Sequence, residues 1–180
     1  NVETPAADFT GAMAITNSAP HEFDVVRFVL DTEYAAVTAF QPKRSDALVA
    51  PVVMMLETVD GQLVTIEINN NAAYGYDVRG ELVGEAGSVQ MVSPAQTLLD
   101  AALAQSAAYD ADWRARYAEA YRQQNKDFLR FVTNGDFPAI ASDCWDGLAA
   151  AQVAEAGVRA LKEGQRIAIP ATPRPAFYAR

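Results

Sequence analysis

Between residues 33 and 92 the chain is made of short apolar segments separated by turn residues, and this pattern limits the fold more than any other feature. In one segment, Val64, Ile66 and Ile68 alternate with polar residues. Such alternation is typical of a strand with one packed face and one polar face. Turn residues such as Asp60-Gly61 favour hairpins. An antiparallel sheet is therefore expected, with strands over residues 33–42, 49–59, 62–73, 74–85 and 87–92.

A helix is expected before the strands, over residues 17–31. Its apolar positions fit one helical face. Pro20 is acceptable only in the first turn, because the amide that it lacks would have no partner there. The helix should therefore begin between Thr16 and Ala19.

Two further helices are expected after the strands, over residues 110–133 and 142–163. The first ends at Asn134-Gly135, and the second is capped by Ser142 or Asp143 and ended by Gly164. In chain order the sheet lies between one helix and a helical pair, and helices should cover its packed face. The expected fold class is α+β.

Charge and cysteine usage restrict the partners and the compartment. The 14 basic and 23 acidic residues give a net charge of -9, which disfavours nucleic acid and anionic membranes. The single cysteine, Cys144, rules out an intrachain disulfide and fits a reducing compartment, so a cytoplasmic location is expected. No apolar run approaches the ~20 residues that span a bilayer. Small neutral ligands or protein partners are favoured.

The N-terminal sequence suggests that the chain is part of a longer protein. The chain does not begin with Met, and residues 1–13 are small and polar without a period. We interpret them as an arm or the remnant of a connection to an upstream domain, and residues 14–180 as one α+β domain.

Several common sites are absent from the sequence. No G-x-G-x-x-G turn is present, and the glycines of GELVGEAG have the wrong spacing, so dinucleotide binding by this chain alone is not expected. One histidine, one cysteine and no D-x-[DN]-x-[DN]-G loop argue against a metal site. Cys144 has no second histidine to serve as its base, and a packed thiol beside Trp145 is expected.

His21 is the only histidine and has polar neighbours at helical spacing. If the helix has begun by Asn17, then Asn17, His21 and Asp24 lie at i, i+4 and i+7 along one stripe. A polar neighbour can hold the imidazole in one tautomer, as proton transfer from a hydroxyl requires. The alternative is that His21 and Asp24 are surface residues of a first turn, with Asp24 favoured by the helix dipole. Helical spacing alone does not decide between a catalytic and a surface role for His21.

A second unusual segment contains two tyrosines separated by one glycine. On a strand, Tyr74 and Tyr76 point to one face, and Asp77 and Arg79 to the other. Paired phenols can bind sugar-like hydroxyls. Aromatic packing at a sheet edge is the alternative.

Four segments together carry a family resemblance: ITNSAPHEFDVVRFVL, YGYDVRGELVGEAGSV, AYRQQNKDFLRFV and WDGLAAAQVAEAGVRAL. In order and spacing they resemble the second domain of inositol 2-dehydrogenases, in the glucose-fructose oxidoreductase (Gfo/Idh/MocA) family. The resemblance covers about residues 13 to 178.

The resemblance implies a two-domain enzyme that acts on a polyol or sugar. Its N-terminal Rossmann domain, absent here, would bind NAD or NADP and supply a lysine from an E-K-P motif. This chain would be the C-terminal domain, built on an open, mainly antiparallel sheet with helices on one face. It would bind substrate and would be inactive alone. An exposed sheet face with alternating apolar residues needs cover, so a homo-oligomer formed through the sheet is also expected.

The resemblance also implies roles for individual residues. His21 matches the histidine that accepts the hydroxyl proton, and Asp24 and Tyr76 match residues that hold ring hydroxyls. Ser18 is a further lining residue on the same interpretation. No residue of this chain would bind cofactor or metal.

The chain departs from the family pattern at Asn17, where the family has aspartate. An amide can hydrogen-bond an imidazole but cannot stabilise its charged form. The change fits either reduced activity or another substrate. A non-catalytic ligand-binding or oligomerisation domain is therefore the rival hypothesis.

Overall fold

The structure is a computed structural model that describes residues 8–45, 49–71, 74–92 and 98–178. The chain divides into two compact units, which we describe separately. The sheet unit comprises residues 4–71 and 139–180, and the hairpin unit comprises residues 72–138 with residues 1–3. His21, Asn17, Asp24 and Ser18 lie in the sheet unit, and Tyr76 lies in the hairpin unit.

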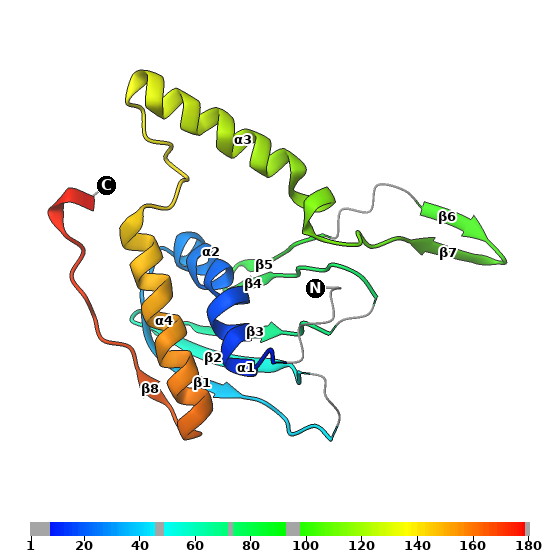
Figure 1. Ribbon diagram of the computed structural model, residues 1–180, viewed down its shortest axis with the longest axis horizontal. Coiled ribbons are helices and arrows are strands. Elements are labelled where there is room, and N and C mark those ends of the chain that lie inside the picture. Colours follow the sequence, from blue (N-terminus) through cyan, green and yellow to red (C-terminus); the bar gives the residue numbers. More distant parts are fainter. Residues whose placement is uncertain (1–7, 46–48, 72–73, 93–97, 179–180) are drawn as a thin grey trace. The chain divides into compact units, whose positions relative to one another are not determined.

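Among the described residues of the sheet unit, four strands form one antiparallel sheet. They are β1 (Tyr34–Phe40), β2 (Val52–Thr58), β3 (Leu63–Ile68) and β8 (Ile167–Ala168). Their order across the sheet is β3-β2-β1-β8, as Figure 1 shows. Gly61, with a φ of 85°, makes the turn between β2 and β3 at the Asp60-Gly61 pair. The α+β fold with an antiparallel sheet is confirmed.

The helical segments of the sheet unit pack on one face of this sheet (Figure 1). They are α1 (Gly11–Met13), the π-helical turn η1 (Ala14–Ser18), α2 (Pro20–Leu30) and α4 (Cys144–Glu163). The largest fully buried side chains between the two layers are Phe23, Ile15, Met54, Leu56, Val37 and Val52. On β3, Ile66 is buried and its neighbours Val64 and Ile68 pack against the same core, as the alternation predicts.

Small residues on α4 let it approach the sheet and η1 closely. Five alanines of α4 each have less than a tenth of their surface exposed. Four of them belong to the core cluster. A Cβ on Gly157 would lie 3.2 Å from Cγ2 of Ile15 and 3.6 Å from Sδ of Met54. A larger residue at this position would therefore have to displace the turn that carries the predicted site residues.

The helix around His21 begins differently from the prediction. The helical backbone begins at Gly11, and α2 itself begins at Pro20, just after the predicted window. In one continuous α-helix the ring of Pro20 would clash with the carbonyl of Thr16. The chain avoids this clash with η1, where the N–H of Ala19 donates to Ala14 O at 3.2 Å. Pro20 then occupies the first position of α2, where it is well tolerated.

The part of the hairpin unit that the structure describes contains two two-stranded sheets and one long helix. The strands are β4 (Glu81–Gly84) paired with β5 (Gly87–Gln90), and β6 (Leu98–Ala101) paired with β7 (Ala104–Ala107). The helix α3 (Trp113–Asn134) ends at Gly135, with a φ of 78°, as the sequence predicts. The strand expected over residues 74–85 is shorter, and β6, β7 and β8 were not expected.

A short 3-10 helix, η2 (Ala176–Tyr178), follows β8 at the C-terminal end of the described chain. Across the described residues, no helix is both long and apolar enough to cross a membrane.

Asp143 fixes the start of α4. Its Oδ1 accepts hydrogen bonds from the N–H of Trp145 at 2.8 Å and of Asp146 at 3.1 Å, and Oδ2 of Asp146 accepts from the Asp143 N–H at 2.9 Å. Desolvation raises the pKa of Asp143, but hydrogen bonds from these amides and from Arg174 outweigh it and lower the pKa below 3.8. The predicted cap is confirmed as a reciprocal capping box.

We expect Asp143→Ala to lower the free energy of unfolding by about 0.5–2 kcal/mol at neutral pH, because two amides of α4 lose their acceptor. The pKa of Asp143 is depressed by folding, so its contribution is present above pH 3.8 and is lost as the pH falls through the folded value. Urea unfolding at several pH values should show the two proteins converging in acid. A constant difference at all pH values would contradict this account. Asp136→Ala, at an exposed aspartate after α3 that caps no helix, is the control and should change the free energy of unfolding by less than about 0.5 kcal/mol.

Candidate functional site

His21 and Asn17 lie at the exposed junction between η1 and α2. The side-chain Oδ1 of Asn17 accepts a hydrogen bond from Oγ1 of Thr16 at 3.1 Å. Among the hydrogen bonds of the described residues, none joins Asn17 to the His21 ring. The π-helical turn accounts for this, since it changes the angular spacing on which the i, i+4 stripe was predicted. Both side chains are open to an incoming molecule.

Asp24 lies one turn after His21 and is contacted from two sides. Its Oδ2 accepts a hydrogen bond from Oγ of Ser142, in the segment before α4. Its Oδ1 lies 3.6 Å from Nη1 of Arg27. Asp24 remains 31% exposed, so its carboxylate can still accept a hydrogen bond from a ligand hydroxyl.

Arg27 is the buried charge beneath Asp24, with 7% of its surface exposed. Its Nε and Nη2 donate to the two carboxylate oxygens of Glu33 at 2.8 and 2.6 Å. The hydrogen bonds with Glu33 raise the pKa of Arg27 despite burial. Its Nη1 lies 3.6 Å from Asp146 as well as from Asp24. Arg27 was not identified from the sequence: Asp24 and Glu33 are near it in sequence, but its contact with Asp146 on α4 depends on the fold.

Ser18 is joined to the end of β3. Nδ2 of the buried Asn70 donates to Oγ of Ser18 at 3.2 Å. Ser18 thereby uses an oxygen lone pair and keeps its own proton available for donation. The contact spans 52 residues of sequence, which is why Asn70 carried no recognisable signal.

Glu22 adds a carboxylate next to His21. Burial raises the pKa of Glu22, and its interaction with His21 acts in the opposite direction. Glu22 is therefore an acidic side chain in the first turn of α2 whose burial opposes its ionisation.

The two tyrosines of the hairpin unit do not form the expected common face. Gly75, with a φ of 135°, interrupts the strand between them. The Tyr74 ring packs edge-on against Tyr109, with centroids 5.1 Å apart, whereas the Tyr76 ring packs against Tyr117 at 6.0 Å. The hydroxyl of Tyr74 also donates to Asp77, which was expected on the opposite face. The tyrosine-pair prediction is therefore wrong in its geometry.

Tyr76 nevertheless has a defined position within the hairpin unit. Its N–H donates to the carbonyl of Asp110 at 2.8 Å in an isolated bridge. Its side chain is half-buried.

Cys144 is exposed at the first position of α4, whereas Trp145 beside it is buried. The expectation of a packed thiol is wrong, because α4 turns Trp145 and not Cys144 toward the core.

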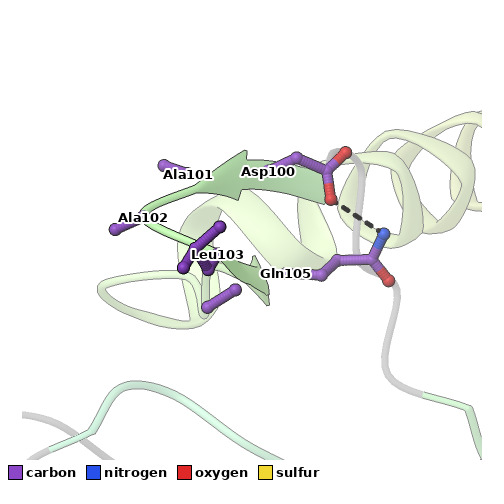
Figure 2. Close-up of a pocket in the computed structure, with 6 residues that line it drawn as sticks. Asp100, Ala101, Ala102, Leu103 and Gln105 are labelled. Atoms are coloured by element: carbon purple, nitrogen blue, oxygen red, sulfur yellow. Dashed lines mark hydrogen bonds between the residues drawn. The ribbon is translucent and has the colours of Figure 1, made fainter.

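Among the described residues, two hollows are found whose linings include neither His21 nor Asp24. One, of about 480 Å³, lies at the turn between β6 and β7. Figure 2 shows that its polar groups bond to each other, Nε2 of Gln105 donating to Asp100 at 3.1 Å. The other is a groove of about 440 Å³ in the sheet unit, lined by Thr16, Pro20 and residues 147–159 of α4. In the part of the chain described, no cluster of three potential ligands suits a metal ion.

Residues 3–90 match the GFO/IDH/MocA C-terminal domain. Among curated proteins, inositol 2-dehydrogenase 1 of Saccharopolyspora erythraea is 41% identical over 94% of this chain and 51% of its own length. Inositol 2-dehydrogenase of Pseudomonas syringae pv. syringae is 36% identical over 93% and 50%. The chain thus spans about half the length of these curated relatives.

The solved structures show the same relationship. Myo-inositol dehydrogenase from Lactobacillus casei, in complex with NAD(H) and myo-inositol, superposes with a TM-score of 0.90 at 28% identity. The superposition covers 99% of this chain and 54% of the Lactobacillus casei chain. The fold described above is therefore that of one half of this enzyme.

Proposed function

The chain is a C-terminal domain of the GFO/IDH/MocA family, and from this premise we propose that it is the substrate-binding and assembly domain of an NAD(P)-dependent dehydrogenase. The proposed substrate is a polyol or sugar such as myo-inositol. The observation that carries the proposal is the polar face of η1 and α2, where His21 is exposed and Asp24 and Ser18 are held by partners from other elements.

In this proposal His21 accepts the proton of the reacting hydroxyl. An exposed imidazole at a helix start can approach a bound hydroxyl and act as a general base. Asp24 accepts, and Ser18 donates, hydrogen bonds to neighbouring ring hydroxyls. Tyr76 is proposed as a further substrate-binding residue from the family resemblance alone.

NAD is the proposed cofactor, and it would accept the hydride released from the substrate carbon. The sequence of this chain contains no strand-to-helix glycine turn of the dinucleotide-binding type, so its residues do not fit the cofactor. We assign cofactor binding to another part of the full-length protein. The 180 residues alone are accordingly expected to show no turnover.

The proposed assembly role is supported by apolar side chains on the sheet face opposite the helices. Phe40, Met55 and Leu63 are each about half exposed or more, on neighbouring strands. Apolar side chains on a face not covered by helices favour self-association, and a closed homo-oligomer through the sheet would bury them.

Asn17 is the position at which this proposal is most readily tested. We expect Asn17→Asp in the full-length protein to raise kcat about threefold to tenfold at alkaline pH, because a nearby carboxylate stabilises the imidazolium that forms. NADH formation from myo-inositol measures the rise in kcat, with Asn125→Asp on α3 as control.

Turnover by neither the natural protein nor the Asn17→Asp variant would favour the second candidate, a non-catalytic ligand-binding or oligomerisation domain. Asn17 itself is the observation behind that candidate, since it lacks the charge that the family pattern provides.

A further inference from the structure

The contact between Ser142 and Asp24 joins two parts of the site that are 118 residues apart. Asp24 is on α2, and Ser142 lies in the segment that leads into α4. Ser142 Oγ donates to Oδ2 of Asp24. Ser142 is itself exposed, so the pair lies at the surface where a ligand can reach it.

Arg27 does not orient Asp24 by a hydrogen bond of its own. Two nitrogens of its guanidinium are committed to Glu33. The third, Nη1, lies 3.6 Å from both Asp24 and Asp146, beyond ordinary hydrogen-bond distance. Arg27 thus favours the ionised carboxylate by charge without fixing its rotation. The orientation of the Asp24 carboxylate depends on Ser142.

The backbone next to Ser142 is fixed by the capping box of α4. Asp143 is fixed by two backbone amides and by Nη2 of Arg174, which lies 3.0 Å from its Oδ2. The N–H of Asp143 is bound in turn by Asp146. A donor placed by such a cap has little freedom, so the hydroxyl of Ser142 is pre-positioned for Asp24.

We propose that Ser142 is a positioning residue for substrate binding, which orients Asp24 so that its free oxygen lone pairs face a ring hydroxyl. This inference rests on the proposed function, and it extends the site from α2 to the segment before α4. It assigns no catalytic step to Ser142.

The test compares Ser142→Ala with the natural full-length protein, by NADH formation at varied myo-inositol. We expect KM to rise about 5- to 10-fold, the effect of losing one hydrogen bond that orients a charged group, with kcat changed less than about twofold. Ser142→Thr keeps the hydroxyl and should restore KM. Ser45→Ala, at an exposed serine in the loop after β1, should leave both parameters unchanged.

A double-mutant cycle separates positioning from a merely structural contact. If Ser142 acts through Asp24, Ser142→Ala added to Asp24→Asn should change KM by less than about twofold. An unchanged KM in Ser142→Ala, or equal KM increases in both backgrounds, overturns the inference while the proposed function stands. Absence of turnover in the natural protein refutes the proposed function, and this inference with it.

Discussion

Replacing His21 by alanine is expected to lower kcat/KM of the full-length protein by about 10²- to 10⁴-fold, the range for loss of a general base. His21 is exposed at the start of α2, and its side chain makes no hydrogen bond to a described residue, so the substitution removes chemistry more than packing. NADH formation from myo-inositol measures the loss. Thermal unfolding should change little.

Two controls make the His21 experiment specific. Val29→Ala alters an exposed residue on the same helix and should retain full activity. Added imidazole should restore part of the turnover of His21→Ala, because it can replace the missing base. Normal turnover by His21→Ala would contradict the assignment of His21 as proton acceptor.

Phe23→Ala is expected to destabilise the chain by about 3–5 kcal/mol, the range for truncating a large buried aromatic side chain. Phe23 has no exposed surface, and its ring meets that of Tyr34 edge-on, with centroids 6.3 Å apart. It lies between Glu22 and Asp24 in sequence, and so anchors the helix that carries the polar face. The measurement is urea unfolding of the chain.

Phe28→Ala provides the matched control, since Phe28 is on the same helix but 60% exposed. Its expected cost is within about 0.5 kcal/mol, as for most surface substitutions. Equal destabilisation by the two substitutions would mean that Phe23 does not anchor the packing of α2 on the sheet.

The elements that sequence predicted well are those with local signals. The strands β1, β2 and β3 follow from short apolar segments separated by turn residues, with alternation in β3, and α4 follows from its cap at Asp143 and its end at Gly164. Each signal lies within a few residues of the element that it defines. Local chemistry therefore sufficed for these three strands and for α4, but not for the η1 turn that carries Asn17 and Ser18.

The elements that were missed depend on distant contacts or unusual turns. The two-residue β8 exists because it pairs with β1, more than 120 residues earlier in the chain. The β6–β7 turn places Ala102 and Leu103 at φ values of 52° and 63°, where glycine or asparagine would be the recognisable residues.

The site shows the same division. His21, Asn17 and Asp24 were proposed together from their helical spacing, and Ser18 was proposed from the family resemblance. Ser142, Asn70 and Arg27 were not, because their contacts join segments that only the fold brings together. Spacing also could not reveal η1, which changes how Asn17 and His21 face each other.

The central claim is that this chain is the substrate-binding half of an inositol- or polyol-oxidising enzyme. The most direct measurement is NADH formation by the full-length protein, given NAD and a panel of inositols and sugars. We predict saturable turnover with at least one polyol, and no turnover by the 180 residues alone. A folded full-length protein that reduces neither NAD nor NADP with any member of the panel would contradict the claim.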